Sequence, residues 1–457
     1  MSQGNAFAYL VLLIWPLFTI WMYHHKSLQV STLVTIVGGF MILPVSTFVD
    51  FPLIPPLGKH SMPVLAAIIG CWLIKKQKIK YFANQGLLQV FVIALFIGVF
   101  ITTELNSDRI ILVDFFLPGL GLHEASSAVV SIFLTVTPFF IGKQFFRGYQ
   151  DQLLMFRFLA IVGMIYTIPI LYEIRMSPQL HTMFYGYFPH SFAQQVKSGG
   201  FRPVVFMGHG LWVSFFIVCV LIVMVSLGEI KSKIKNQSTS TLGYYLLIVL
   251  VLCKSKAALL YGLFSIVCIK KLSYNKQLTL AVFLAMLTLL YPTMSIMKVV
   301  PHQQLANVAE TYLGADRARS LVFRFDNERR LLEHAKKRFF FGWGGWGRNR
   351  VFDEETGKDL TVTDGRWAIT FGTSGMIGFI AEFGLLAIAI LKARSASKWL
   401  KEKKELCLLA AHALLVSIVM IDQLPNASLA PWLWLLAGIL LGRSEQIIVD
   451  NKRVVNV

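Results

Sequence analysis

Apolar residues come in long runs along this chain, and short polar segments separate the runs. A helix that crosses ~30 Å of hydrocarbon needs about 20 mostly apolar residues, or fewer when it is partly buried in protein. The pattern therefore predicts an all-α polytopic membrane protein with twelve or thirteen transmembrane helices. The predicted spans are 6–22, 30–49, 61–74, 86–103, 127–142, 154–172, 205–227, 242–252, 257–269, 278–293, 368–391, 405–421 and 429–442. The eighth and ninth are either separate spans or two half-spans that meet at a buried turn.

One long polar segment, 295–366, interrupts this pattern. Its middle, ADRARSLVFRFDNERRLLEHAKKRF, alternates charged and apolar residues at three- and four-residue spacing, which predicts an amphipathic helix. The sequence FFFGWGGWGRNR follows, a Gly/Trp turn that ends such a helix. We therefore expect transmembrane helices in 1–294, a large extracytoplasmic helical loop in 295–366, and C-terminal transmembrane helices with a cytoplasmic tail in 367–457.

Composition excludes a soluble globular protein. Of the 457 residues, 56% are apolar and only 15% are charged, and the mean hydropathy is +0.63. The net charge of +19 is largely a topology signal. Strict alternation of the spans places Lys26, Lys75, Lys143, Lys270 and Lys392 on one side, as expected of cytoplasmic loops. The charge is therefore no sign of nucleic-acid binding, and the N-terminus and segment 295–366 are expected outside.

The first span and the cysteines further narrow the class of protein. The first span has neither a basic start nor a small-residue cleavage site, so we expect it to be retained rather than removed as a signal peptide. The five cysteines are few and scattered in or beside spans, which predicts neither a disulfide framework nor a zinc site. Only the basic residues on the outer side then need a functional explanation.

Four basic or titratable residues lie near the predicted outer ends of the middle spans. The stretch FRPVVFMGHG places Arg202 at the mouth of the seventh span and His209 about two turns deeper, where an ionisable side chain usually faces the bundle interior. Alternatively, His209 is neutral and bonded to a backbone carbonyl. Lys254 and Lys256 lie where the topology rule disfavours lysines, so they either bind a phosphate or extend to lipid head groups.

The long outer segment contributes a further cation and an acid. Arg324 lies at the edge of the apolar face of the predicted helix, because Leu321, Phe325 and Glu328 surround it at helical spacing. The segment also holds ten acids, so an ion-paired or solvated role is the alternative for each of its arginines. Asp364 lies where the chain re-enters the membrane.

Four stretches follow one another on this side of the membrane: FRPVVFMGHG, CKSKAALL, the stretch from Arg324 through FFFGWGGWG, and TDGRWAITFGTSGMIGFIAEFGLL. Together they resemble one family, the bacterial O-antigen ligase and polysaccharide polymerase superfamily of integral-membrane glycosyltransferases. FRPVVFMGHG resembles its arginine motif at a span entry, and CKSKAALL its Ser-Arg-Gly/Ala-Ala-Leu motif. The stretch from Arg324 through FFFGWGGWG resembles its arginine helix and Gly-rich turn, and TDGRWAITFGTSGMIGFIAEFGLL the span that follows. The resemblance covers residues 199–391.

Two residues depart from the family pattern. Lys256 stands where the second motif usually has an arginine, which keeps the charge but loses the bidentate fork. Asp364 stands where the ligases have a histidine, which favours a polymerase and leaves the base unassigned.

The resemblance implies glycosyl transfer at the periplasmic face of a bacterial inner membrane, without a metal or cofactor. The donor would be a saccharide on undecaprenyl diphosphate, the acceptor another lipid-linked saccharide or a lipid core sugar, and a chain-length regulator protein a further partner. Arg202, Lys256 and Arg324, together with Lys254, would bind the departing diphosphate.

The resemblance also implies a base and a sugar-binding surface. Asp364 and His209 are the candidates for the base, with Glu173 and Glu382 behind them. The aromatic residues that would stack on sugars, or else anchor the loop at the interface, are Trp343, Trp346 and Trp367.

Other functions stay open at this point. Ligation of a finished chain to a lipid is the nearest alternative. A flippase of lipid-linked oligosaccharides, or a polysaccharide exporter, would need basic residues deep in the first six spans, and those spans contain almost none. A non-catalytic membrane scaffold is a third class.

Overall fold

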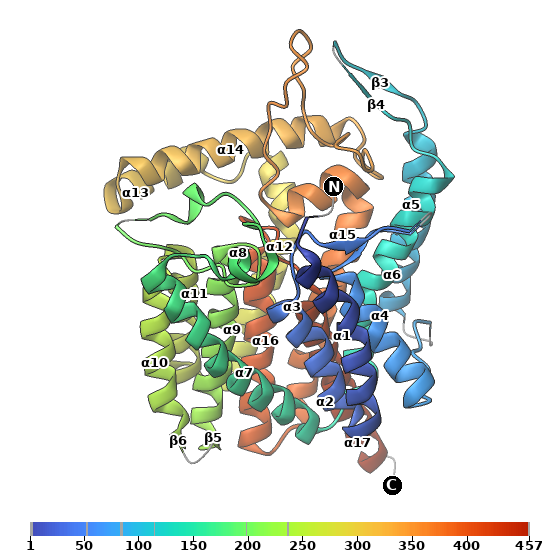
Figure 1. The fold of residues 1–457 in the computed structure, drawn as a ribbon. Helices are drawn as coiled ribbons and strands as arrows, with labels where there is room; N and C mark the ends of the chain where they lie inside the picture. The colour runs from blue at the N-terminus through green and yellow to red at the C-terminus, as the bar shows by residue number, and fades with distance from the viewer. Residues whose placement is uncertain are drawn as a thin grey trace.

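Helices make up most of the structure and form two layers (Figure 1). The computed structural model describes residues 3–51, 54–82, 86–113, 115–197, 199–234 and 237–455. One layer is a tall bundle of apolar helices. The other, which we call the outer layer, lies across one end of that bundle and contains α13 (His302–Leu313) and α14 (Ala315–Lys336). The C-terminus is at the opposite end of the bundle.

The remaining elements follow in chain order. The helices of the first half are α1 (Ala6–His25), α2 (Leu28–Leu33), α3 (Gly39–Ile42), α4 (Ser61–Ile69), α5 (Leu87–Leu105), α6 (Leu122–Phe145), α7 (Tyr149–Met176), α8 (Leu180–Tyr185) and α9 (Gly210–Glu229). Those of the second half are α10 (Thr239–Leu252), α11 (Lys256–Lys271), α12 (Tyr274–Ile296), α15 (Arg366–Ala396), α16 (Lys403–Asp422) and α17 (Pro431–Val455). Short π- and 3₁₀-helical turns are η1 (Val34–Gly38), η2 (Gly70–Ile74), η3 (Ala193–Gln195) and η4 (Ser397–Trp399). Three antiparallel ribbons pair β1 (Phe48–Val49) with β2 (Leu57–Gly58), β3 (Ile110–Ile111) with β4 (Phe116–Leu117), and β5 (Lys233–Ile234) with β6 (Gln237–Ser238).

Nine helices among the described residues are long and apolar enough to cross a membrane. They are Ala6–His25, Leu87–Leu105, Leu122–Phe145, Tyr149–Met176, Gly210–Glu229, Tyr274–Ile296, Arg366–Trp399, Lys403–Asp422 and Pro431–Asn451. The shorter apolar helices Leu28–Ile42, Ser61–Ile74 and Thr239–Leu252, together with α11, correspond to the other predicted spans. The prediction of an all-α polytopic membrane protein is confirmed.

The turn at residues 253–255 separates two short helices. The 14 residues of α10 and the 16 residues of α11 extend about 21 Å and about 24 Å, at ~1.5 Å per residue. Both pack against α9, and Cys253 and Ser255 in the turn are buried. The structure therefore favours two short antiparallel helices here over two halves of one span.

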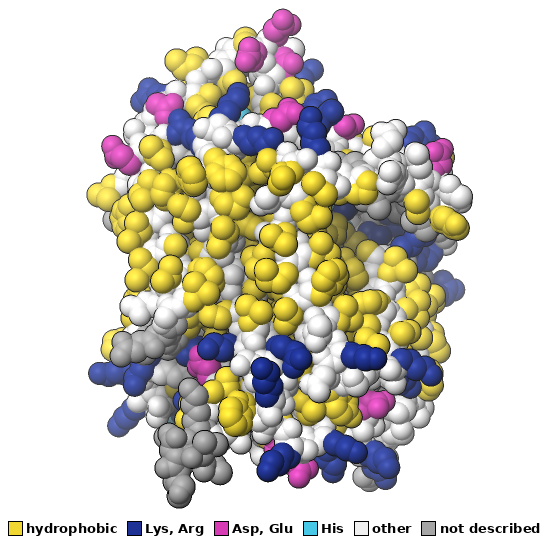
Figure 2. Space-filling view, turned by 180° about the vertical axis from the view of Figure 1, so that it is seen from behind, with side chains coloured by type: hydrophobic (Ala, Val, Ile, Leu, Met, Phe, Trp, Pro, Cys, Tyr) yellow, Lys and Arg dark blue, Asp and Glu magenta, His cyan; other side chains and the backbone are white. Residues whose placement is uncertain are grey.

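The centre of the bundle is α9. Its sequence GLWVSFFIVCVLIVMVSLGE is apolar all round, as expected of a helix that is surrounded by other helices. In its most apolar window 89% of the residues are buried, against 17% for α5 at the periphery. The exposed apolar side chains of such outer helices form the broad hydrophobic band in Figure 2. Lys and Arg side chains line the edge of this band that is far from the outer layer, which fits the predicted topology.

The outer layer begins where α12 ends and finishes where α15 begins. The amphipathic helix predicted from the sequence is α14, whereas α13 was not predicted. Within α15 the backbone is interrupted at Gly375, which has φ 67° and ψ −172°. Only glycine adopts this conformation readily. The predicted span 368–391 is therefore a broken helix, and the break contacts the outer layer.

Candidate functional site

Residues 339–347 of the Gly/Trp turn fit into the break in α15. Its backbone pairs with the backbone on both sides of Gly375, as one strand pairs with another. Four hydrogen bonds form this contact, from Trp343 N to Gly372 O (2.8 Å), Gly344 N to Thr373 O (2.8 Å), Met376 N to Phe339 O (2.8 Å) and Ile377 N to Phe340 O (3.2 Å). The turn thus supplies hydrogen-bond partners for the backbone groups that the break leaves free, as irregular backbone buried in protein requires.

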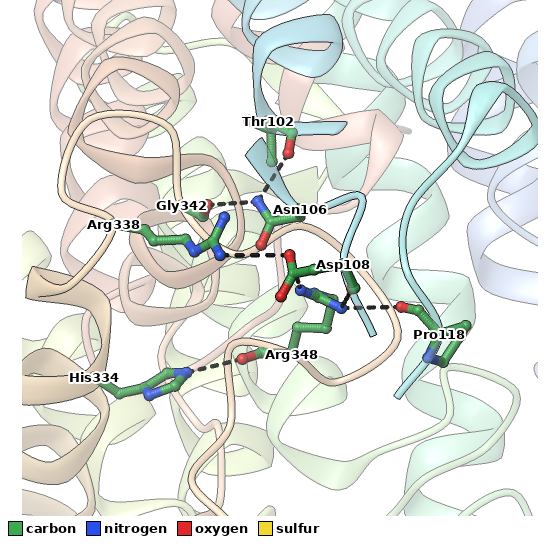
Figure 3. Close-up of polar contacts among 8 residues, drawn as sticks. All are labelled: Thr102, Asn106, Asp108, Pro118, His334, Arg338, Gly342 and Arg348. Carbon is green, nitrogen blue, oxygen red and sulfur yellow. Dashed lines mark hydrogen bonds and ion pairs between the residues drawn. The ribbon is translucent and has the colours of Figure 1, made fainter. Parts of the chain in front are cut away.

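Polar side chains fix the other side of the same turn (Figure 3). Arg348 is fully buried and donates from Nη1 to the carbonyl oxygens of Asp108 (2.8 Å) and Pro118 (3.0 Å). Its Nη2 lies 3.3 Å from Asp108 Oδ1, which also faces Arg338 at 3.6 Å. Asn106, at the end of α5, donates to the Gly342 carbonyl at 3.1 Å. The C-terminal end of α14 and the turn after it are therefore held by α15 and by the segment that follows α5.

The middle of the outer layer is held by one acid of α14. Glu328 accepts hydrogen bonds from Tyr291 Oη (3.1 Å) and Ser295 Oγ (2.6 Å), both on α12. Burial raises the pKa of the Glu328 carboxyl, and the two hydroxyl donors lower it by less. This contact lies one helical turn from Arg324 and fixes the face of α14 that meets the bundle.

Arg324 and Asp364 lie together in a cavity of about 260 Å³ beneath α14. Arg324 Nε is 3.7 Å from Asp364 Oδ2, and Arg324 Nη1 donates to the Pro425 carbonyl at 3.3 Å. Both side chains stay partly accessible, with 39% and 43% exposed. Apolar side chains including Trp367 line the rest of this hollow, which we call the Arg324 cavity. It combines one cation, Arg324, with two carboxyl groups, Asp364 and Glu328, in a mostly apolar recess.

Arg202 and Lys254 form a second basic group, on the connection into α9. The buried Arg202 donates from Nη2 to the Lys254 carbonyl at 3.2 Å. Lys254 in turn donates from Nζ to the Lys197 carbonyl at 3.0 Å, and Lys254 adopts a left-handed φ of 52°. Lys256 begins α11 and is exposed. The structure thus joins Arg202 to Lys254 and Arg324 to Asp364. Arg202, Lys254 and Lys256 are not among the described residues that line the Arg324 cavity.

His209 does not lie two turns inside a span, so this part of the sequence interpretation is wrong. It is the N-cap of α9, which begins at Gly210, because Val205 and Gly208 adopt left-handed φ values of 50° and 92° and keep the preceding segment out of the helix. Its Nδ1 accepts a hydrogen bond from the backbone N–H of Leu211 at 3.0 Å. Burial, together with neighbouring cations, lowers the pKa of His209 to about 4. The neutral ring then carries its proton on Nε2 and has no free nitrogen to act as a base.

The two reserve acids already have partners. Glu173, at the end of α7, accepts the backbone N–H groups of Leu180 (2.9 Å), Val204 (2.7 Å) and Val205 (2.7 Å). It therefore positions the segment that carries Arg202. Glu382 accepts hydrogen bonds from Arg366 Nε (2.9 Å) and Thr370 Oγ1 (2.8 Å) across the break in α15.

The three tryptophans lie in different surroundings. The ring of Trp343 stacks on His334 at 4.3 Å, and the Arg338 guanidinium lies 4.5 Å over it. Trp367 is buried against Tyr291, with ring centroids 5.1 Å apart, in the wall of the Arg324 cavity. Trp346 is 58% exposed, which makes it the most accessible of the three for stacking on a ligand.

Sequence reasoning missed the acid that orients the site. Glu328 entered only as a neighbour of Arg324, although it is the contact between α14 and α12. Its i+4 spacing from Arg324 on the apolar edge of the helix was the available signal. Tyr291 and Ser295, four residues apart on α12, place two hydroxyl groups on one face of that helix, and this was the corresponding signal on the partner helix.

No protein-family model matches this chain, and no curated protein matches it in sequence. The function must therefore be argued from the residues and their arrangement.

Proposed function

We propose that this multi-pass membrane protein is a glycosyltransferase that moves a saccharide from a polyprenyl diphosphate to a lipid-linked saccharide acceptor. Polymerisation of polysaccharide repeat units, such as those of O-antigen or exopolysaccharide, is the reaction that we favour. The proposed location is a bacterial inner membrane, with the outer layer in the periplasm. The observation that carries the proposal is the pairing of Arg324 with Asp364 in the Arg324 cavity, at the end of the bundle away from the lysine-rich edge.

The chemistry of the transfer asks for both groups. An acceptor hydroxyl attacks the anomeric carbon, the bond from that carbon to the diphosphate oxygen breaks, and the diphosphate leaves with the bonding electrons. Arg324 is suited to stabilise the negative charge that develops on the leaving group. Asp364 is suited to take the proton of the attacking hydroxyl.

The two groups must separate when substrate binds, because the base and the leaving group act on opposite faces of the sugar. In the ligand-free arrangement they are in contact at 3.7 Å. A partly exposed ion pair of this kind contributes about 0–1 kcal/mol, so a bound diphosphate can readily replace the carboxylate as the partner of Arg324. Arg202, Lys254 and Lys256 stay proposed contacts of the same lipid-linked donor, outside the Arg324 cavity.

Polymerisation is preferred over ligation because Asp364 replaces the histidine expected of a ligase. His209 is an unsuitable substitute, since its Nδ1 caps α9. A chain-length regulator protein is the partner expected of a polymerase.

The experiment is to incubate the purified protein with lipid-diphosphate-linked oligosaccharide and to separate the products by size. A ladder of longer lipid-linked products supports the polymerase. One transfer to a different lipid would instead identify a ligase. The absence of any glycosidic product from protein that still binds the donor would refute glycosyl transfer and favour a flippase or exporter.

A further inference from the structure

A second hollow lies on the other side of the chain segment that forms the Arg324 cavity. Gly365 and Trp367 line the Arg324 cavity, whereas Arg366 between them lines a separate cavity of about 430 Å³. Lys59 and His60 line this second hollow, which we call the Lys59 cavity. None of its described lining residues is acidic.

Helix ends add to the positive charge around the Lys59 cavity. Ser61, Arg366 and Pro431 line it and are the first residues of α4, α15 and α17. Trp212, the third residue of α9, also lines it. The N-terminal end of a helix carries a partial positive charge, so four such ends favour an anion in the space between them.

Lys59 is the second and independent sign of an anion. Only 3% of this residue is exposed, and its Nζ donates to the carbonyl oxygens of Leu43 and Phe206, the latter at 2.9 Å. It forms no ion pair with any carboxylate in the described part of the chain. Burial lowers the pKa of Lys59 well below its usual range. Burial thus disfavours the charged form of Lys59, and a bound phosphate would supply the counter-charge that favours it.

A groove of mixed lining continues from the Lys59 cavity, with apolar residues of α5 and α6 beside Glu124 and the turn residue Trp346. This groove, of about 440 Å³, lies between α5 and α6 and shares Pro55 and Ser131 with the Lys59 cavity. Small residues line it, including Ala94, Gly98 and Ala128. The space beside Gly98 is empty, because a Cβ atom there would meet nothing within 4 Å. We call it the α5–α6 groove.

We infer that the Lys59 cavity and the α5–α6 groove together bind a second lipid, a polyprenyl phosphate or diphosphate. Its phosphate would lie beside Lys59 and Arg366, and its chain along the groove. Two lipid sites on opposite faces of segment 364–367 would suit a reaction that joins two lipid-linked saccharides. The assignment of this lipid as the acceptor rests on the proposed function, whereas the binding itself does not.

The test counts bound lipid by native mass spectrometry, with undecaprenyl phosphate added to the delipidated full-length protein. Gly98→Leu should bind one lipid fewer than the wild type, because the Cβ position at Gly98 is open and the new side chain would occupy the groove. Ile97→Phe is the matched control, since Ile97 is 53% exposed on the same helix and does not line the groove. Lys59→Met should weaken the same binding event about tenfold to a hundredfold, as expected for the loss of a charged donor.

Two results would overturn the inference. The site does not exist if Gly98→Leu and Lys59→Met bind the same number of lipids as the wild type with the same affinity. The lipid is a phospholipid rather than a polyprenyl phosphate if phosphatidylglycerol displaces undecaprenyl phosphate at equal concentration. Neither result depends on glycosyl transfer. If the wild type forms a product ladder but the two variants bind lipid as the wild type does, the second site alone is refuted. If the two variants lose lipid binding but the wild type forms no ladder, the proposed function alone is refuted.

Discussion

Replacing Arg324 by alanine separates its role in the reaction from its role in the fold. The ion pair with Asp364 is partly exposed and contributes about 0–1 kcal/mol. The hydrogen bond to the Pro425 carbonyl, at 3.3 Å, adds about 1 kcal/mol. The substitution should therefore lower the free energy of unfolding by no more than about 2 kcal/mol.

The expected effect on the reaction is larger. Removing one donor to a developing anion in a partly dry site costs about 3–4 kcal/mol of transition-state stabilisation. At ~1.4 kcal/mol for each factor of ten, the rate should fall by roughly a hundredfold or more. Arg324→Lys should recover part of this loss, because it keeps the charge but loses the fork of donors.

The assay measures the initial rate of ladder formation by equal amounts of purified protein, with the melting temperature recorded in parallel. Arg329→Ala is the matched control, because Arg329 is on the same helix and also pairs with an acid. Its partner Asp326 lies 3.3 Å away, but the Arg329 side chain is 64% exposed. The reasoning is wrong if Arg324→Ala and Arg329→Ala retain the same rate, within about threefold of the wild type.

Three further predictions follow from other residues of the outer layer and the break. Asp364→Asn should abolish chain lengthening, whereas Asp353→Asn, in a turn of the same loop, should be mild; equal rates for the two would remove Asp364 from the reaction. Because the pKa of Glu328 is raised in the folded protein, its contribution to stability is present at low pH and is lost as the pH rises through the raised pKa. The melting temperature of the wild type should fall over that range, and Glu328→Gln should flatten the profile. Gly375→Ala should greatly lower the yield of folded protein, since its Cβ atom would overlap the Phe340 backbone at a φ of 67°. Gly98→Ala, with open space around it, should be tolerated.

The sequence predicted the bundle and α14 well, because both depend on hydrophobic periodicity, which is local. Each of the thirteen predicted spans corresponds to a helix, and α14 begins at Ala315 as the charged pattern indicated. The place of Arg324 near the re-entry of the chain was also predictable, because the apolar edge of an amphipathic helix faces the bundle.

Other features depend on contacts that no local pattern contains. The apolar run VVFMGHGLWV continues without interruption, so it placed His209 inside a span. In the structure Glu173, about 30 residues earlier in the chain, binds the backbone of Val204 and Val205 and stops the helix from starting there. Likewise, Gly372, Gly375 and Gly378 recur every three residues, and such spacing favours close approach of a neighbouring helix or a lipid tail. The partner is instead the Gly/Trp turn of the same chain.

The pairing of the Gly/Trp turn with α15 also limits how the protein can change shape. Pulling the two apart would break four backbone hydrogen bonds, at about 1 kcal/mol each, and would expose the polar groups of a broken helix. This end of α14 is therefore a fixed pivot. The far end, where α13 lies beyond the bundle in Figure 1, has no comparable anchor among the described backbone hydrogen bonds. A bulky oligosaccharide that needs more room should gain it by a movement of α13, while the Gly/Trp turn and the Glu328 contact to α12 stay in place.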